Sequence, residues 1–267
     1  MAVAAFEAAT VAESYQRYLE PVLFGPWAHR LVTYAGVQPG DVVLDVAAGT
    51  GAVSRVAARA AGPGGAVVAT DVSANMLSYA TRSAPRSAPI TSLVGPAEAI
   101  DLPDASVDVV LCQQGLQFMP DRIAVVRECL RVLRPGGVVA VSVWATDERL
   151  DPFDAYADAL QRDATAAGST RTISNASLAM SVLGIVDTML VAGAGEVRAT
   201  RQELAVRWPT VDAEIAGLFG TPFGPFVEAL PSGRRDDVLA DVRNQLSSDG
   251  RTSDHLTMSV LGRGVRR

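Results

Sequence analysis

The stretch that decides the fold is VVLDVAAGTGAVSRVAARA, residues 42–60. An apolar run stops at an acid, Asp45, and two glycines, Gly49 and Gly51, follow it closely. A helical pattern begins directly after the second glycine. A continuous apolar run is typical of a strand covered on both faces, so this order of strand, glycine turn and helix predicts a parallel α/β sheet with a ligand at the turn.

The same alternation of strand and helix continues along the chain. The predicted strands are 42–46, 66–71, 90–95, 107–114 and 138–144, and the predicted helices between them are 52–61, 73–84 and 121–133. This order gives a mostly parallel sheet with helices on both faces and right-handed crossovers, so we expect a doubly wound, Rossmann-like α/β fold. Ligands of such sheets bind beyond the carboxyl ends of the strands, where the distinctive residues of this chain lie.

The pattern loosens after Trp144. Helices are expected near 152–166 and 178–191, and a strand at 196–204. The segment 255–265 is expected to be a last strand that pairs antiparallel at the edge of the sheet.

These elements suggest a division of the chain into three parts. Residues 36–204 and 251–267 are expected to form the core of the fold. Residues 205–250 are rich in Pro, Gly and Phe near their start, and they lie between the last two strands. We therefore expect them to form a cap insertion that binds substrate. Residues 1–35 are helical and aromatic in pattern.

Composition argues against several classes of partner. The chain has 23 basic and 29 acidic residues, which gives a net charge of −6, and all of the basic residues are arginine. Because no basic patch large enough for duplex nucleic acid is evident, no nucleic-acid partner is expected. The N-terminus carries Glu7 and Glu13 and no basic segment, so no signal peptide is expected.

Two further features bear on location. The longest apolar stretch, 178–195, carries Asp187 at its middle, where a charge in a membrane costs roughly 3 kcal/mol. We therefore expect a buried helix followed by a turn here and no membrane insertion. Two cysteines, Cys112 and Cys129, are too few for a disulfide framework, so a cytoplasmic location is expected. A monomer or a homodimer would fit equally well.

Three ligands are considered for the glycine turn. A phosphate-binding P-loop needs Lys and Ser or Thr after its last glycine, but Ala52 and Val53 stand there and the chain has no lysine. A dinucleotide turn needs G-x-G-x-x-G/A, which this stretch matches imperfectly, although Asp71 lies at the distance expected of the acid that binds NAD ribose. The glycines alone therefore leave NAD and S-adenosylmethionine (SAM) open.

The charges around the turn favour SAM. Its amino-acid end is a zwitterion, so Asp45 suits the ammonium, whereas the same acid would repel a pyrophosphate. The helix that begins near Ala52 points its positive end at the carboxylate. Asp71 can accept hydrogen bonds from both ribose hydroxyls, and Val72 and Met76 can face the adenine.

Four stretches extend this pattern over residues 36–145. They are VLDVAAGTG, ATDVSANML, DLPDASVDVVLCQQGLQFMPDR and RVLRPGGVVAVSVW. In order and spacing they resemble the successive motifs of class I SAM-dependent methyltransferases, in the small-molecule branch that includes the ubiquinone/menaquinone biosynthesis (UbiE-like, type 11) family. The resemblance implies a seven-stranded sheet whose last strand is antiparallel, SAM as cofactor with S-adenosylhomocysteine as product, and a small-molecule methyl acceptor.

The resemblance also implies a set of cofactor-binding residues. They are Asp45, Ala47, Gly49 and Gly51 at the methionine end, Asp71 at the ribose, Pro96, Ala97 and Glu98 at the adenine, Gln113 and Gln114 beside the methionine and substrate, and Tyr15 and Tyr18 from an N-terminal lid (residues 1–35). Two positions depart from the family pattern. Ala47 stands where glycine is frequent, and Pro96 stands where an aspartate often bonds the adenine amino group.

Methyl transfer is an in-line displacement that requires a positioned nucleophile in a dry site. The family often carries histidine after the fourth strand, but Leu116-Gln117-Phe118 matches that stretch here. We therefore expect catalysis by proximity and desolvation, with any base coming from the cap or the N-terminus. The candidate catalytic residues are His29, Gln114 and Gln117.

The expected acceptor is an apolar or aromatic molecule, because Phe219, Phe223 and Phe226 lie in the cap. Asp147 and Glu148 follow the fifth strand and could bind Mg²⁺, but the matching metal pattern is not evident, so no metal is expected. Two other classes stay open. One is a SAM-fold protein that does not methylate, such as a cyclase or a SAM sensor, and the other is an NAD-dependent oxidoreductase.

Overall fold

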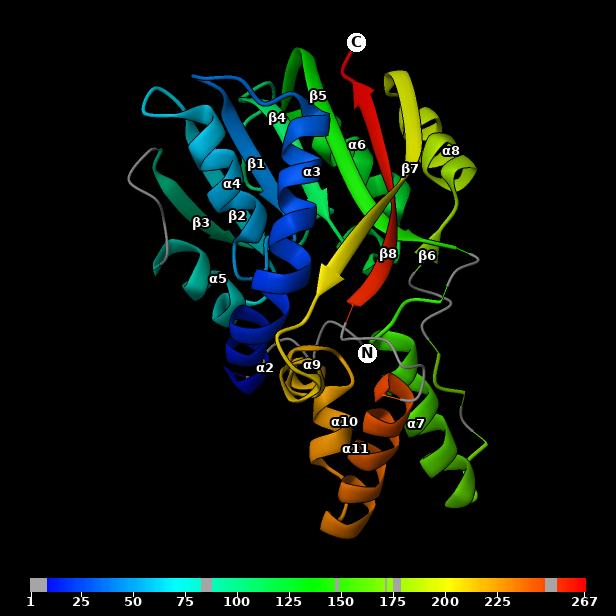
Figure 1. Cartoon of the computed structure of the whole chain (residues 1–267). Coiled ribbons are helices and arrows are strands. Elements are labelled where there is room, and N and C mark those ends of the chain that lie inside the picture. The colour runs from blue at the N-terminus through cyan, green and yellow to red at the C-terminus, as the bar shows by residue number, and fades with distance from the viewer. Residues whose placement is uncertain (1–8, 83–87, 147–148, 171, 175–178, 248–253) are drawn as a thin grey trace.

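A computed structural model describes residues 9–82, 88–146, 149–170, 172–174, 179–247 and 254–267. Figure 1 shows a twisted sheet with helices on both faces and a lobe of helices below one end of the strands. The arrowheads of the parallel strands point toward this lobe, so the ligand-binding end of the sheet faces it.

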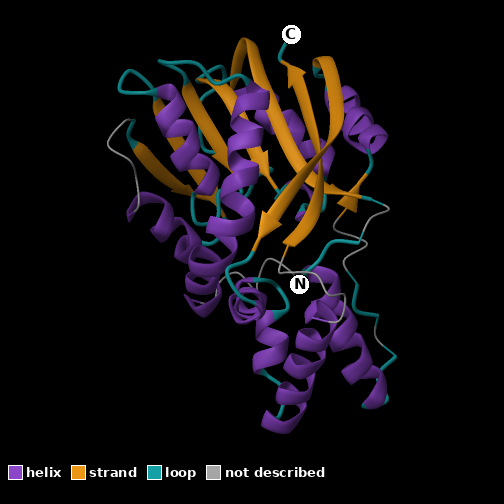
Figure 2. Ribbon diagram, viewed as in Figure 1, coloured by secondary structure: helices purple, strands orange, loops and turns teal. Residues whose placement is uncertain are grey.

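The sheet has eight strands in the part of the chain that the structure describes (Figure 2). They are β1 (Val42–Val46), β2 (Ala66–Asp71), β3 (Ile90–Val94), β4 (Val107–Gln113), β5 (Leu133–Ala145), β6 (Ala179–Met180), β7 (Gly195–Arg207) and β8 (Asp254–Val265). Their order is β3-β2-β1-β4-β5-β8-β7, and the short β6 pairs with the end of β5. Strands β1 to β5 pair in parallel, whereas β8 is antiparallel to both of its neighbours. The Rossmann-like sheet with an antiparallel last strand is thereby confirmed.

The place of the last strand differs from the expected one. β8 lies between β5 and β7, and β7 forms the edge. On one side Val143 of β5 pairs with Val260, and on the other side Arg201 of β7 pairs with the same residue. β8 is apolar enough for this inner place, since Val260 and Leu261 are buried, whereas β7 alternates exposed and half-buried residues as an edge strand does.

The helices around the sheet follow the predicted pattern closely. They are α2 (Ala9–Ser14), the π-helix η1 (Tyr15–Phe24), α3 (Gly25–Ala35), α4 (Ala52–Ala61), α5 (Ala74–Arg82), the 3-10 turn η2 (Leu116–Phe118), α6 (Arg122–Val132), α7 (Phe153–Ala166), α8 (Val182–Ala192), α9 (Val211–Gly217), the 3-10 turn η4 (Leu218–Gly220), α10 (Gly224–Glu228) and α11 (Ser232–Ser247). Local chemistry sets their starts. For example, Asp121 accepts a hydrogen bond from the Ala124 amide at 2.9 Å and caps α6.

Apolar side chains of the central strands pack on both faces of the sheet. Val43 of β1 belongs to the cluster that contains Trp27 of α3, whereas its neighbour Leu44 belongs to the cluster that contains Val125 of α6. Successive residues of a strand point to opposite faces, so a strand that is covered on both sides must be apolar throughout. This explains the continuous apolar run from which the fold was predicted.

The lobe below the sheet is built from α7 and from the helices between β7 and β8. Ion pairs join α7 to α11, with Arg234 to Asp163 at 2.6 Å and Arg162 to Asp241 at 2.7 Å. The expected cap, 205–250, therefore does not make the lobe alone. α7, which was expected within the core, packs beside α11 in the lobe because these pairs and buried apolar contacts hold it there.

Within the apolar stretch 178–195, residues 179–180 form β6 and residues 182–192 form α8, and most of this helix is not buried. Only Ile185 and Met189 are buried on α8, while Leu183 is 72% exposed. The helix therefore lies on the surface of the sheet with one narrow face inward. No helix of the described residues is long and apolar enough to cross a membrane.

Candidate active site

A cavity of about 850 Å³ lies at the carboxyl ends of the parallel strands. Its walls come from the sheet, from η1 and from the helical lobe, so it joins all three parts of the molecule. The predicted site residues that line it are Tyr15, Ala47, Gly49, Asp71, Val72, Met76, Ala97, Glu98, Gln113, Gln114 and Gln117. The structure therefore brings most of the predicted site together around one space.

Asp71 ends β2 at the wall of the cavity, and its carboxylate is fixed by the backbone around it. One oxygen accepts a hydrogen bond from the Gly49 amide at 2.9 Å, and the other accepts one from the Ser73 amide at 2.9 Å. The first bond ties the glycine turn after β1 to the end of β2. A half-buried carboxylate in this place fits a pair of ribose hydroxyls, with exposed Val72 next to it as an apolar wall.

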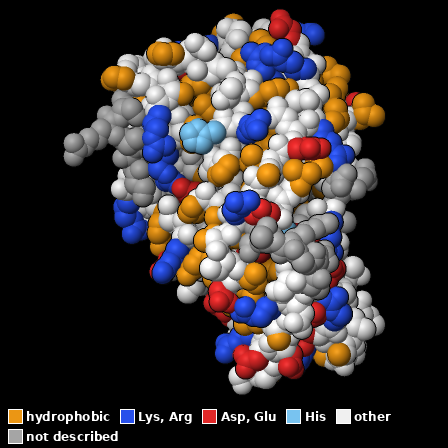
Figure 3. All heavy atoms as spheres, in the orientation of Figure 1, with side chains coloured by type: hydrophobic (Ala, Val, Ile, Leu, Met, Phe, Trp, Pro, Cys, Tyr) orange, Lys and Arg blue, Asp and Glu red, His pale blue; other side chains and the backbone are white. Residues whose placement is uncertain are grey.

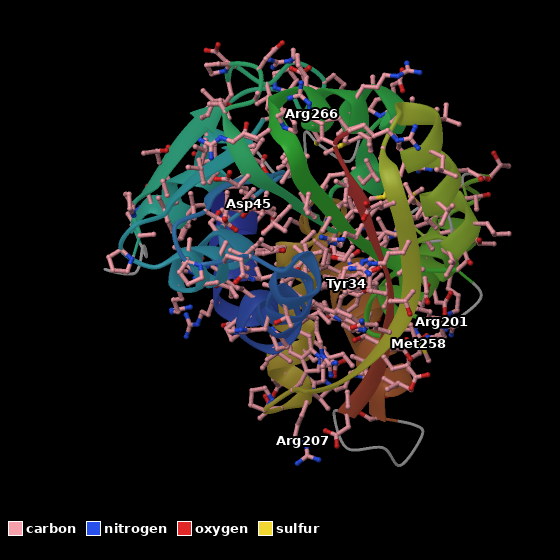
Figure 4. All side chains as sticks on the ribbon, turned by 90° about the horizontal axis from the view of Figure 1, so that it is seen from above. Tyr34, Asp45, Arg201, Arg207, Met258 and Arg266 are labelled. Carbon is pink, nitrogen blue, oxygen red and sulfur yellow. The ribbon has the colours of Figure 1, made fainter. Side chains whose placement is uncertain are left out.

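Asp45 departs from its expected role at the methionine end. Its side chain does not line the cavity and is 1% exposed, and Figure 4 shows it in the interior beside the first strands. It accepts a hydrogen bond from the Ser54 hydroxyl at 2.6 Å, and the Ser54 backbone also bonds it. Asp45 therefore caps the first turn of α4 from the preceding strand. Burial, which disfavours the charged form, raises its pKa to about 7.

Four other predicted residues also lie outside the cavity wall. Gly51 has φ +86°, and a Cβ there would lie 2.6 Å from that of Ala80, so it serves the turn and the packing of α5. Pro96 is exposed, and the lining residue of that loop is Ala97. Tyr18 lies on the other side of η1, where the guanidinium of its neighbour Arg17 stacks 5.3 Å from the ring centre.

His29 is exposed on α3 and does not line the cavity. α3 packs on the sheet through its apolar face, which contains Trp27 and Leu31, and the helical period carries residue 29 to the outer face. The structure therefore does not bring His29, the expected base, to the cavity.

Ala47 takes a backbone conformation that favours glycine. Its φ is +54°, in the left-handed region, which explains why glycine is frequent at this position of the motif. The methyl group fits because Gly115 faces it: a Cβ at Gly115 would lie 2.6 Å from the Ala47 Cβ and 3.1 Å from the Cys112 sulfur. Gly115, on a neighbouring segment, thus leaves room for the methyl group of Ala47, which stands where the family often has glycine.

Three amide side chains at and just after the end of β4 line the cavity. Gln113 donates from Nε2 to the Phe24 carbonyl of η1 at 2.9 Å, which leaves its Oε1 without a partner among the described residues. Gln117 donates to Gln114 Oε1 at 3.1 Å, and Gln114 donates to the Ser259 hydroxyl at 3.0 Å. The Gln117 oxygen is likewise buried and without a partner in the described part of the chain. Two acceptor oxygens at a cavity suit hydrogen-bond donors on bound molecules.

Aromatic rings connect the two ends of the cavity. Tyr15 stacks on Phe24 with the ring centres 4.6 Å apart, Phe24 lies 6.1 Å from Trp144, and Trp144 lies 6.0 Å from Phe153. All four line the cavity, together with Phe223 and Phe226 from the lobe, whereas Phe219 does not. Burial and nearby carboxylates raise the pKa of Tyr15 well above its ordinary value, so this phenol stays protonated.

Some residues of the cavity wall had no signal in the sequence. Asp154, at the start of α7, is the carboxylate that the lobe contributes to the described cavity wall. Asp154 lies more than 80 residues from Asp71 in the sequence, so the sequence did not indicate that both line the same cavity. Asp147 and Glu148, considered for Mg²⁺, lie outside the described residues. Among those that are described, no group of three or more His, Cys, Asp or Glu could hold a metal ion.

The groups that line the cavity fit a molecule in which a zwitterionic amino acid is joined to a nucleoside, as in SAM. It offers the carboxylate of Asp71, the glycine turn, the apolar wall of Val72 and Met76, and the partnerless oxygen of Gln113. Acidic and basic side chains are interspersed over the face in Figure 3, which shows no broad basic surface there.

Comparison with known proteins agrees with this fit. Residues 44–141 match a family described as methyltransferase domain. The nocamycin O-methyltransferase of Saccharothrix syringae is 30% identical over 242 residues, which cover 84% of each chain. The ubiquinone/menaquinone biosynthesis C-methyltransferase UbiE of Burkholderia orbicola (strain MC0-3) is 38% identical over 135 residues, or 49% of this chain and 55% of that protein.

Solved structures show the same fold. The YcgJ protein from Bacillus subtilis superposes with a TM-score of 0.59 at 19% identity, covering 91% of this chain and 99% of that chain. A Haemonchus contortus phosphoethanolamine N-methyltransferase in complex with SAM superposes with a TM-score of 0.56 at 16% identity, covering 90% and 52%. The chain belongs to the class I SAM-dependent methyltransferases, and SAM is its cofactor.

Proposed function

We propose that the protein transfers the methyl group of SAM to a hydroxyl oxygen of a largely apolar small molecule of moderate size. The observation that carries this proposal is the continuous cavity of about 850 Å³ that runs from Asp71 to the aromatic lobe. Its volume exceeds what a small alcohol would fill, and its far wall is mostly aromatic and aliphatic.

The relatives favour oxygen over carbon as the methylated atom. The match to the O-methyltransferase covers 84% of this chain and so includes much of the lobe, whereas the match to the C-methyltransferase covers 49%. The shorter match has the length of the cofactor-binding half alone, which methyltransferases for different acceptors share.

SAM supplies a methyl group on a positively charged sulfur, which is a good leaving group. We assign the cofactor to Ala47, Gly49, Asp71 and Gln113 and the adenine to the wall formed by Val72, Met76, Ala97 and Glu98. Trp144, Phe153 and Phe223 exclude water from the acceptor half. Excluding water matters because the reacting oxygen must lose its solvent shell before it can approach the methyl carbon in line with sulfur.

The amide chain after β4 orients the acceptor in this proposal. Gln117 is held by Gln114, and its buried oxygen can accept a hydrogen bond from a polar group of the acceptor other than the reacting hydroxyl. Neither amide can take a proton at neutral pH. We assign that role to Asp154, so the hydroxyl proton passes to its carboxylate as the new bond between oxygen and carbon forms and the bond between carbon and sulfur breaks.

The test is methyl transfer from ¹³C-methyl SAM to a set of aromatic and aliphatic hydroxy compounds, each paired with its methyl ether. We expect products heavier by one methylene whose ¹³C signal is that of a methoxy group, and no product from the ethers. A C-methyl signal would contradict the oxygen assignment. Altered acceptors of unchanged mass, with SAM intact, would instead support a non-methylating role, as in the [4+2]-cyclase SpnF, which shares the fold.

A further inference from the structure

The π-helix η1 contacts the glycine turn through Glu20, a largely buried acid, and contacts the last residue of β4 through the Phe24 carbonyl. The side chain of Glu20 is 13% exposed and does not line the cavity, whose wall η1 forms through Tyr15, Leu19 and Phe24. π-Helical turns are uncommon and occur often at functional sites. The contacts of Glu20 therefore bear on what this segment does besides lining the cavity.

Glu20 closes a ring of three residues around the turn. One carboxylate oxygen accepts a hydrogen bond from the Thr50 hydroxyl at 2.6 Å, and the other pairs with the guanidinium of Arg55. Arg55 in turn donates from Nη1 to the Thr50 carbonyl at 2.7 Å. Thr50, which is fully buried, is thus held at its side chain and at its backbone.

The residues on either side of Thr50 need this support. Gly49 and Gly51 have φ of +55° and +86°, and glycine loses more conformational freedom on ordering than any other residue. If the glycine turn were flexible, its loss of conformational entropy on ordering would weaken cofactor binding. A turn that is already held in place does not lose this entropy on binding. A second bond anchors the same turn from the other side, from the Gly49 amide to Asp71.

We propose that Glu20 is a positioning residue for the cofactor: it holds Thr50 so that the glycine turn is preformed for the methionine end of SAM. Glu20 itself does not touch the cofactor. The N-terminal segment is then a part of the cofactor site and not only a cover over it. This inference depends on the cofactor and is independent of the acceptor and of the methylated atom.

Two ligands separate positioning from a purely structural role. S-Adenosylhomocysteine (SAH) carries the methionine-like end, whereas 5′-methylthioadenosine has the same adenosine without the amino-acid group. Thr50→Val removes only the hydroxyl that Glu20 binds, and it keeps the shape of the side chain. Thr50→Ser keeps the hydroxyl and is the matched rescue.

Calorimetry on the full chain gives the dissociation constants of both ligands. We expect Thr50→Val to weaken SAH about tenfold or more, because a hydrogen bond to a charged group is lost, and to weaken methylthioadenosine less than about threefold. Thr50→Ser should bind both ligands as the unmodified protein does. Equal weakening of both ligands, or unchanged SAH binding, would overturn the proposal.

Glu20→Gln provides the second measurement. It leaves Arg55 with a weaker partner, so the protein will be less stable. Unfolded protein binds neither ligand, so this loss of stability does not by itself change the ratio of the two dissociation constants. The same selective loss of SAH is expected. Glu13→Gln, an equal change of charge at an exposed residue of α2, is the control and should leave the ratio unchanged. A ratio equal in Glu20→Gln and Glu13→Gln would refute a positioning role for Glu20.

Discussion

The buried acid within strand β1, Asp45, leads to a prediction about stability and pH. Burial raises the pKa of Asp45 from its ordinary 3.8 to about 7. Between these two values the unfolded chain gives up the proton, while the folded protein keeps it. The folded state therefore binds more protons over this range, and stability from this group falls as the pH rises from about 4 to about 7. The full penalty, about 4 kcal/mol, is reached above pH 7.

Asp45→Asn removes this dependence, because an amide does not ionise and can still bond the Ser54 hydroxyl. The measurement is the free energy of unfolding in urea for both proteins at several pH values from about 4 to about 8. We expect similar stability at the acid end and a growing advantage of the variant, up to about 4 kcal/mol, at the alkaline end. A difference that does not change with pH, or one that favours Asp45 as the pH rises, would refute the reasoning.

Three further changes probe the cavity. Gly115→Ala should lower the free energy of unfolding in urea by about 1–3 kcal/mol, because its methyl group would meet that of Ala47. Much of this loss should disappear in the double variant with Ala47→Gly. If Gly115→Ala lowers stability equally in both backgrounds, the two residues do not compete for space. Gln117→Ala should raise KM and lower kcat by no more than about tenfold, whereas a loss of many orders with unchanged KM would give Gln117 a direct chemical role. Asp154→Asn should lower kcat about a hundredfold without changing SAH affinity, and an unchanged kcat would remove it as the proton acceptor.

Much of the sheet could be predicted because its signal is local. The strand 42–46 and the helix 52–61 were predicted with the bounds that the structure has, since an apolar run, a left-handed glycine and a helical period lie side by side in the chain. The place of β8 could not be predicted this way. Its position between β5 and β7 depends on pairing between residues more than 45 positions apart in the case of β7 and more than 100 in the case of β5.

The candidate site shows the same division between local and distant signals. Asp71 and Gly49 were predicted because each lies where a strand ends, and such ends meet at one edge of a parallel sheet. Asp45 was predicted at the ligand, yet it caps α4. A buried acid before a helix can bind either a ligand or the first turn of that helix, and the sequence does not decide between the two. Glu20 and Asp154 carried no motif, and only the packing of η1 and α7 brings them to the site.

The most direct test of the account is the binding of SAH to the purified protein by calorimetry, with NAD⁺ titrated separately and Asp71→Ala as the variant. We predict that SAH binds and NAD⁺ does not, and that the variant loses about a hundredfold in SAH affinity because two hydrogen bonds to a carboxylate disappear. Asp71→Asn keeps the shape of the side chain, and its SAH affinity should lie between those of the unmodified protein and Asp71→Ala. Binding of NAD⁺, or SAH affinity that is indifferent to Asp71, would contradict the account of the cavity.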